Sequence, residues 1–296
     1  MGPAPGGGFF GRAEKGGEVK TSSPWLQRVA ALYDSKRRDF NWRLAPDGVI
    51  HHHNGLVYDK AAFLRRVKCG GEAGKARIHA AETALSELGF KYLGRPRPGM
   101  ALLDAGCGRG GSSLLLAEKY AGLKITGVTV SAYQAAAARA AARGRGLAGR
   151  VRFSRASMLA LPFKPASFDR VWACESTEHV PDLRLFFSEA GRAAKPGARL
   201  VIIAWVRNAA HAEGREYARL ADKAYVTKIH AEKEYLEACK AGGWKLKVKK
   251  DLTGPTAAYW AGRLALGDGS GTESFMAPGF ASRALLYRLY AYDLVE

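Results

Sequence analysis

The sequence predicts an α/β protein built on a doubly wound, mostly parallel sheet, for two reasons. Short apolar runs alternate with helical patterns between residues 100 and 205, the order expected when helices connect neighbouring parallel strands. The first run, 100–104, ends in an acid and is followed by Gly106, Gly108 and Gly110. Glycines at such spacing allow a tight turn between a strand and a helix, where a ligand can approach bare backbone.

The remaining elements follow in order along the chain. A helix is expected over 77–90, because its apolar residues fall on one helical face: Ile78, Ala81, Leu85 and Leu88. The expected strands are 100–104, 125–130, 151–154, 168–174 and 199–205. The expected helices between them are 112–120, 132–145 and 182–194. Ser131 is suited to cap the second of these helices.

Composition divides the chain into three regions. Residues 1–23, rich in Gly, Pro and charge, are expected to be a flexible tail. Residues 24–99 are expected to form an N-terminal helical cap, and 100–296 the core. Helical patterns after residue 205 interrupt the strand order, so the segment 206–241 is expected to be a lid-like insertion. A basic strand at 245–250 and a loop-rich, glycine-containing region are expected to follow it.

The charge and the cysteine content indicate which partners and which cellular compartment to expect. The net charge of +19 attracts polyanions, either nucleic acid or a small phosphorylated substrate. Basic residues are spread along the chain without an arginine-rich arm or zinc-knuckle spacing, so no nucleic-acid partner is expected. The four cysteines form no C-x-x-C pair, which favours free thiols and a cytoplasmic location. No membrane association is expected, and a homo-oligomer remains open.

The glycine turn has the pattern D-x-G-x-G-x-G. A dinucleotide site would need an acid at the end of the next strand, where Thr129 and Ser131 stand instead. A P-loop would need Lys and then Ser or Thr after the last glycine, where Gly111 and Ser112 stand. The turn could also join a strand to a helix without binding any ligand. The turn resembles motif I of the class I S-adenosylmethionine (SAM) methyltransferases.

Three adjacent histidines, His51, His52 and His53, precede the core. Side chains alternate along an extended segment, so at most His51 and His53 are expected to face one site. An internal run does not fit an expression tag, and zinc ligation lacks a matching Cys or spaced His. Hydrogen bonding to a substrate phosphate is the favoured role for these histidines.

Several motifs together resemble the prenyl diphosphate C-methyltransferases, the family of geranyl diphosphate 2-C-methyltransferase. They cover roughly residues 30 to 262: D-G-x-x-H-H-H-x-G at 47–55, D-A-G-C-G-R-G-G-S at 104–112, G-V-T-V-S-A-x-Q at 127–134, E-S-T at 175–177 and I-H-A-E-K-E-Y-L at 229–236. The resemblance implies the Rossmann-like class I methyltransferase fold, with SAM as donor and a prenyl diphosphate as acceptor. It makes 24–99 part of the acceptor pocket and 206–241 the acceptor lid.

The resemblance also implies roles for individual residues. The SAM-binding residues would be Asp104, Gly106, Gly108, Thr129, Ser131, Gln134, Ser157 and Met158. The catalytic group would comprise Glu175, Tyr225 and His230. The acceptor would contact Tyr33, His51, His52, His53, Asn54 and Trp260. Magnesium would help hold the diphosphate, with Glu82 as a candidate ligand.

Two positions depart from the family pattern. The geranyl enzyme has an aromatic residue after the triple histidine, where this chain has Asn54. It also has an acid after the Tyr-Trp pair, where this chain has Ala261. Loss of a pocket aromatic weakens cation–π support and changes the pocket's shape. The acceptor could therefore be of the isopentenyl, geranyl or farnesyl type.

The chemistry that the resemblance implies needs a carboxylate. Methylation of an alkene leaves a tertiary carbocation, and a nearby carboxylate can stabilise that charge and then remove a proton. Glu175 is the expected base; alternatively, it is an acid favoured by a helix N-terminus. A tocopherol- or sterol-like methyltransferase is one rival, and an RNA-binding methyltransferase is another. The sequence contains no N-P-P-Y type motif, and 175–177 stands in its place.

Overall fold

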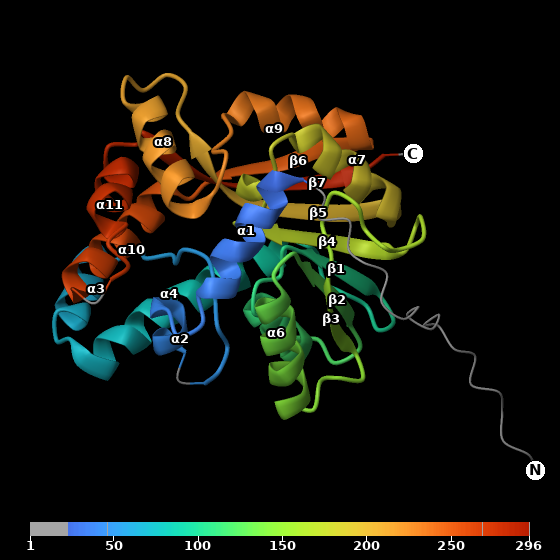
Figure 1. The fold of residues 1–296 in the computed structure, drawn as a ribbon, viewed down its shortest axis with the longest axis horizontal. Helices are drawn as coiled ribbons and strands as arrows, with labels where there is room; N and C mark the ends of the chain where they lie inside the picture. Colours follow the sequence, from blue (N-terminus) through green and yellow to red (C-terminus); the bar gives the residue numbers. More distant parts are fainter. Residues whose placement is uncertain (1–22, 46, 268, 296) are drawn as a thin grey trace, which may run out of the picture.

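The computed structural model describes residues 23–45, 47–267 and 269–295. A seven-stranded sheet with the order β3-β2-β1-β4-β5-β7-β6 forms its centre, and helices cover it (Figure 1). The strands are β1 (Ala101–Ala105), β2 (Lys124–Thr129), β3 (Val151–Arg155), β4 (Phe168–Cys174), β5 (Ala194–Arg207), β6 (Trp244–Asp251) and β7 (Leu285–Leu294). The expected doubly wound α/β fold is confirmed.

Strands β1 to β5 pair in parallel, and β7 runs antiparallel to both β5 and β6. Parallel strands are buried on both faces, so they read as continuous apolar runs rather than as alternating patterns. The stretch Leu200–Ala204 of β5 illustrates this, because each of its side chains has no exposed surface or nearly none. The carboxyl ends of β1, β2 and β4 therefore meet at one edge of the sheet, where ligands bind in such folds.

The helices of the core match the sequence-based predictions to within a few residues. They are α5 (Gly111–Lys119), α6 (Ala132–Gly144) and α7 (Leu183–Ala193), with the short 3-10 turn η1 (Thr177–His179) after β4. Ser131 caps α6 as predicted, since its Oγ accepts a hydrogen bond from the Gln134 backbone N–H at 3.0 Å. Helices α8 (Gly214–Tyr225) and α9 (Glu232–Ala238), followed by the 3-10 turn η2 (Cys239–Gly242), occupy the predicted insertion.

The region expected to be rich in loops is instead mostly regular. It contains α10 (Thr253–Leu266), α11 (Glu273–Ala281) and strand β7. Pro278 and Gly279 fall inside α11, and these are residues that usually indicate a helix boundary. Tertiary packing overrides that preference, because α10 packs against α3, α4 and α11 and both helices are largely buried.

The N-terminal cap consists of α1 (Pro24–Ser35), α2 (Phe40–Leu44), α3 (Lys60–Val67) and α4 (Gly71–Tyr92). Figure 1 shows α2, α3 and α4 grouped with α10 and α11 to one side of the sheet. Helix α1 packs on α6, and the Asp34 carboxylate accepts hydrogen bonds from Ser131 Oγ (2.6 Å) and from the Tyr133 backbone N–H (3.0 Å).

The sequence also led to expectations about an N-terminal tail and about membrane association. Nearly all of the predicted tail, residues 1–22, lies outside the described residues. Among the helices that the structure describes, none combines the length and the apolar character needed to cross a membrane.

Candidate active site

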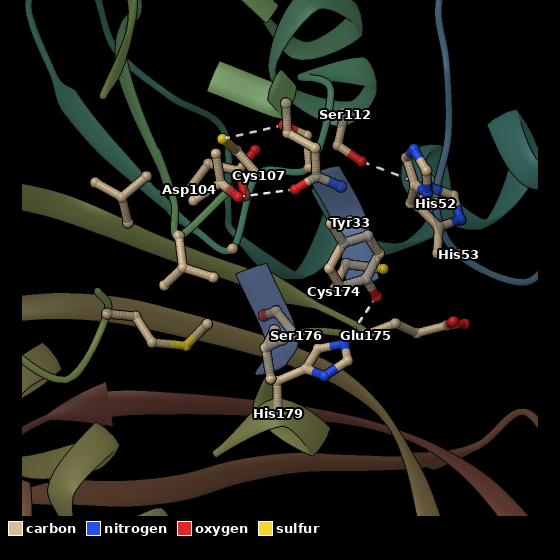
Figure 2. A pocket seen from close by; sticks show the side chains of 18 of the residues that line it. Tyr33, His52, His53, Asp104, Cys107, Ser112, Cys174, Glu175, Ser176 and His179 are labelled. Carbon is tan, nitrogen blue, oxygen red and sulfur yellow. Dashed lines mark hydrogen bonds between the residues drawn. The ribbon is translucent and has the colours of Figure 1, made fainter. Parts of the chain in front are cut away.

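A cavity opens at the carboxyl edge of the sheet and encloses about 840 Å³, counting the space open to solvent (Figure 2). Its floor comes from the turn after β1, the end of β2 and the loop after β3. Helix α1 covers it with Leu26, Val29 and Tyr33. We call this the first cavity. Its position is the one in which doubly wound sheets bind nucleotide-like ligands.

The glycine turn has a backbone that other residues cannot adopt without strain. Gly106 has φ +92°, and a Cβ there would lie 2.3 Å from the Cβ of Ser176. Real Cβ atoms do not approach one another so closely, so both the conformation and the space demand glycine. At Gly108, with φ +53°, the nearest side-chain atom would be 3.5 Å away in His52. The turn thus presents bare backbone to the first cavity.

Asp104 is the penultimate residue of β1 and lines the first cavity beside this turn. Ser113 Oγ donates a hydrogen bond to its Oδ2 at 2.6 Å. Burial raises the pKa of Asp104 to about 7, and the hydrogen bond from Ser113 opposes that shift. A cationic ligand group in the cavity would favour the charged carboxylate.

Seven of the eight predicted SAM-binding residues line the first cavity: Asp104, Gly106, Gly108, Thr129, Gln134, Ser157 and Met158. Thr129 Oγ1 donates to Gln134 Oε1 at 2.8 Å, which fixes the orientation of the glutamine amide. Ser131 is the exception. Its side chain is fully buried and bonds the Asp34 carboxylate and the first turn of α6, so it positions α1 rather than facing the cavity.

All three adjacent histidines line the first cavity, which corrects the expectation that at most two could face one site. The expectation assumed an extended strand, whereas residues 49–57 form an irregular segment without strand pairing. The three side chains are fixed by different partners. His51 Nε2 bonds Thr83 Oγ1 (3.2 Å), His52 Nε2 accepts from Arg109 Nε (2.6 Å), and His53 Nε2 bonds Ser86 Oγ (2.9 Å).

Burial keeps these imidazoles neutral near pH 7. It lowers the pKa of His52 to about 3, assisted by the positive charge of Arg109, and the pKa of His53 to about 4. A neutral imidazole offers one donor and one acceptor. The histidines therefore contribute hydrogen bonds rather than fixed positive charge.

A second cavity of about 760 Å³, again counting space open to solvent, lies beside the first. Five residues line both: Tyr33, His52, His53, Glu175 and His179. These shared residues form the junction of the two cavities. The other walls of the second cavity come from the segment after α1, from α2, η1, β5 and the end of α8, and from the α10–α11 region. They include Tyr225, Trp260 and Arg263. The predicted lid therefore forms only part of its cover.

Glu175 lies at this junction, immediately after β4, in a strained backbone conformation with φ +47°. Non-glycine residues rarely adopt positive φ, and such strain concentrates at functional sites. The Asn54 backbone N–H (2.7 Å) and Tyr287 Oη (2.6 Å) both donate to its Oε1. Burial raises the pKa of Glu175 to about 7, against the effect of these two bonds. The result is a fixed carboxyl group able to exchange a proton near neutral pH.

Tyr225, Asn54 and Trp260 line the second cavity, whereas His230 and Glu82, which were also expected at the site, line neither cavity. His230 is buried, with Nε2 bonded to the Val180 carbonyl (2.8 Å) and Nδ1 to Glu234 Oε1 (3.1 Å). Glu82 accepts a hydrogen bond from Tyr259 Oη (2.7 Å), and burial raises its pKa to about 8. Both side chains therefore occupy supporting positions, which corrects the expectation that they face ligands.

Several residues of the site were not found from the sequence. Tyr287 comes from β7, whose aromatic run was not recognised as a strand, and Arg263 from the unrecognised α10. Arg109 sits inside the glycine turn and bonds the Arg37 carbonyl, Asp39 and His52. The signal that the sequence offered for Tyr287 is the run of apolar and aromatic residues over 285–292, which is typical of a strand.

Comparisons with known proteins agree with this geometry. The family model described as "Methyltransferase domain" matches residues 103–202. Geranyl diphosphate 2-C-methyltransferase of Streptomyces lasalocidi is 31% identical over 99% of this chain and 98% of its own length. The crystal structure of geranyl diphosphate C-methyltransferase from Streptomyces coelicolor, bound to Mg²⁺, geranyl-S-thiolodiphosphate and S-adenosyl-L-homocysteine, is 31% identical. It superposes with a TM-score of 0.85 over 93% of this chain and 99% of that one.

The chain belongs to the geranyl diphosphate C-methyltransferase family. This methyltransferase therefore has the class I SAM-dependent fold and is a C-methyltransferase. Likeness to other methyltransferases covers less of it. A probable tocopherol O-methyltransferase of Oryza sativa is 41% identical, but over only 60% of this chain and 46% of its own length.

Proposed function

We propose that this methyltransferase transfers the methyl group of SAM to an alkene carbon of a prenyl diphosphate, with Glu175 as the base. The observation that carries the proposal is the junction of the two cavities at Glu175. One cavity fits a donor held by bare backbone, the other accommodates an acceptor, and a carboxyl group faces both. Relatives matched over nearly the full chain are named for this reaction on geranyl diphosphate.

The first cavity fits SAM. Gly106 and Gly108 present backbone without a side chain to this cavity, and the buried Asp104 carboxylate suits the ligand's ammonium group. When bound, SAM supplies an electrophilic methyl group on a positively charged sulfur. The chain's own contribution is to hold that methyl group in line with the acceptor, because an alkene is a weak nucleophile that gains most from positioning.

The second cavity fits an acceptor that carries oxygen atoms. Within the described residues, three side-chain nitrogens of its lining residues are buried and lack a hydrogen-bond partner: Asn54 Nδ2, Trp260 Nε1 and Arg263 Nε. Unpaired buried donors are costly, so such a cluster favours a ligand rich in acceptor oxygens. A diphosphate is such a ligand, and Lys36 and Arg263 supply positive charge to the same cavity.

The aromatic walls suit the intermediate that alkene methylation produces. Tyr33, Trp205, Tyr225 and Trp260 line the second cavity. The Nζ of Lys36 lies 5.0 Å from the centre of the Tyr225 ring, so that face already accommodates a cation. Faces of this kind stabilise positive charge on carbon. Glu175 then removes a proton from the carbon next to the cationic centre, and the electrons of that C–H bond restore the double bond.

A site for magnesium is not evident from a cluster of ligands among the described residues. No cluster of three or more His, Cys, Asp or Glu side chains arranged to hold a metal occurs in the described part of the chain. Mg²⁺ does not need one, since it commonly binds through one or two carboxylates and substrate phosphates. Besides Glu175, the carboxyl groups lining the second cavity are Asp39 and Glu178. Burial raises the pKa of Glu178 to about 8, whereas the neighbouring Arg109 helps to hold the pKa of Asp39 below its usual value. Asp39, rather than Glu178 or Glu82, is therefore the carboxylate that would contact a metal accompanying the diphosphate.

Removal of divalent metal should therefore suppress activity. We expect EDTA to lower the rate of methyl transfer to a diphosphate acceptor by at least tenfold, because the diphosphate would lose its counter-charge, and added Mg²⁺ to restore it. Initial rates measured with and without EDTA check this expectation. SAM affinity, measured by calorimetry under the same conditions, should stay constant. Indifference of the rate to EDTA would remove magnesium from the proposal.

The proposed function is tested by incubating the enzyme with SAM, Mg²⁺ and separate acceptors: C5, C10 and C15 prenyl diphosphates, a tocopherol precursor, a sterol and RNA. Mass spectrometry then reports which acceptor gains one methyl group in place of a hydrogen. Methylation of any of the diphosphates supports the proposal and also assigns the chain length. Methylation of only the phenol, the sterol or RNA would contradict it.

A further inference from the structure

Tyr33 occupies the junction of the two cavities although it comes from the N-terminal helix α1. It lines both cavities, and Figure 2 shows it between the side formed by Asp104 and Ser112 and the side formed by Glu175 and His179. A methyl group that moves from the first cavity to the second must pass this junction. The hydroxyl of Tyr33 is therefore near the path of the transferred group.

The hydrogen-bond pattern fixes which way the Tyr33 hydroxyl proton points. His179 Nδ1 lies 3.0 Å from the Val226 carbonyl, which can only accept, so Nδ1 carries the hydrogen. Burial lowers the pKa of His179 to about 4, so the ring is neutral and its Nε2 is an acceptor. Tyr33 Oη, 2.8 Å from Nε2, must donate its proton there. Its oxygen lone pairs then remain directed away from His179.

The hydrogen-bonded chain from Val226 through His179 to Tyr33 includes a residue with a strained backbone. Val226 caps α8 with φ +54°, and a β-branched residue rarely adopts that conformation. The conformation directs the Val226 carbonyl at His179. Helix α1 is bound to the same histidine a second time, because Trp25 Nε1 donates to the His179 carbonyl at 2.8 Å. Three elements, α1, η1 and α8, thus converge to orient one tyrosine hydroxyl.

We propose that Tyr33 is a further catalytic residue, whose Oη accepts C–H···O contacts from the methyl group of SAM, and that His179 and Val226 position it. This proposal depends on SAM as donor under the proposed function, but not on the identity of the acceptor. Carbon bound to a cationic sulfur carries polarised C–H bonds, which suit an oxygen lone pair. During transfer the alkene π electrons form the new C–C bond, and the electrons of the broken S–C bond stay on sulfur. Tyr33 gains and loses no proton.

The test compares Tyr33→Phe with a matched control, Tyr133→Phe. Tyr133 Oη also tethers the N-terminal region, by donating to the Arg37 carbonyl at 3.0 Å, but Tyr133 does not line either cavity. Each variant loses one hydroxyl group and the hydrogen bond that it donates. Only the hydroxyl of Tyr33 would contact the methyl group of SAM. Calorimetry would measure the affinities of the full-length enzymes for SAM and for S-adenosylhomocysteine, which lacks that methyl group. The melting temperature of each variant confirms that it folds.

We expect Tyr33→Phe to weaken SAM binding by about two- to fivefold and to leave S-adenosylhomocysteine binding unchanged. Tyr133→Phe should keep the ratio of the two affinities at the wild-type value. Equal loss of both affinities in Tyr33→Phe would show a purely structural role, and unchanged affinities would show no role; either overturns the proposal. The proposed function fails if no prenyl diphosphate is methylated. The ratio of SAM affinity to S-adenosylhomocysteine affinity in Tyr33→Phe decides the role of Tyr33 in either case.

Discussion

Replacing Glu175 with glutamine is expected to lower turnover by about 10²- to 10⁴-fold, the range that a positioned acid or base contributes. Glutamine keeps an acceptor oxygen for the Asn54 N–H and for Tyr287 Oη, so the local geometry should persist. What is lost is the ability to stabilise a cation with negative charge and to take its proton. Single-turnover rates, combined with calorimetric SAM binding that stays within about twofold of wild type, check this result.

The pH dependence of the wild-type enzyme gives an independent measure of the same group. Burial raises the pKa of Glu175 to about 7, and the base acts only when it is ionised. Activity should therefore be lost as the pH falls through about 7 and should reach a plateau above it. A profile that is flat from pH 6 to pH 8 would contradict the assignment of Glu175 as the base.

Glu178 provides the matched control for Glu175→Gln. It is a second buried carboxyl group lining the acceptor cavity, and its Oε1 accepts a hydrogen bond from the Trp205 backbone N–H at 2.7 Å. It does not line the first cavity, so it is farther from the path of the methyl group than a residue of the junction. Glu178→Gln should lose much less turnover than Glu175→Gln. The opposite ranking would make Glu178 the base.

The second large effect is expected at the glycine turn. Gly106→Ala places a Cβ about 2.3 Å from Ser176 in a backbone with φ +92°. Strain of this kind costs on the order of 1–3 kcal/mol and shifts the turn that faces the donor. We expect SAM affinity to fall by at least tenfold, since about 1.4 kcal/mol corresponds to one factor of ten. Calorimetric titration with SAM measures this loss.

Gly144→Ala is the control for that variant. Gly144 lies at the end of α6, has an ordinary φ and has open space where a Cβ would stand. It tests whether any added methyl group on a glycine of the core disturbs binding. Its SAM affinity should equal that of wild type. Equal affinities for Gly106→Ala and wild type would show that the turn does not hold the donor.

The order of strands and helices was largely predictable, because each parallel strand is a continuous apolar run and each following helix has its own spacing and cap. The five strands predicted between residues 100 and 205, the helices between them and the basic strand predicted at 245–250 all appear in the structure. The region after 251 was not predictable in this way. Gly267 correctly indicates the end of α10, but Pro278 and Gly279 indicate a break where α11 continues, because both helices bury one face against neighbouring elements.

Some residues of the site were predictable from local sequence, and others were placed by tertiary packing. Asp104 is the penultimate residue of β1, and Gly106 and Glu175 directly follow β1 and β4, so the arrival of all three at one edge follows from local sequence. His230 and Glu82 were expected at the site, but tertiary packing turns both side chains into contacts with other protein groups. Tyr287 approaches Glu175 across 112 residues of chain, a contact that no local pattern encodes.

The sequence by itself determined the parallel sheet, the strained glycine turn and the carboxyl group at the end of β4, since each follows from the conformational limits of a few adjacent residues. Only the tertiary structure decided that α1 brings Tyr33 to the junction and that His51, His52 and His53 all face the first cavity. It also decided that α10 and α11 complete the acceptor cavity. These features depend on packing between segments far apart in the chain, where burial outweighs local preference.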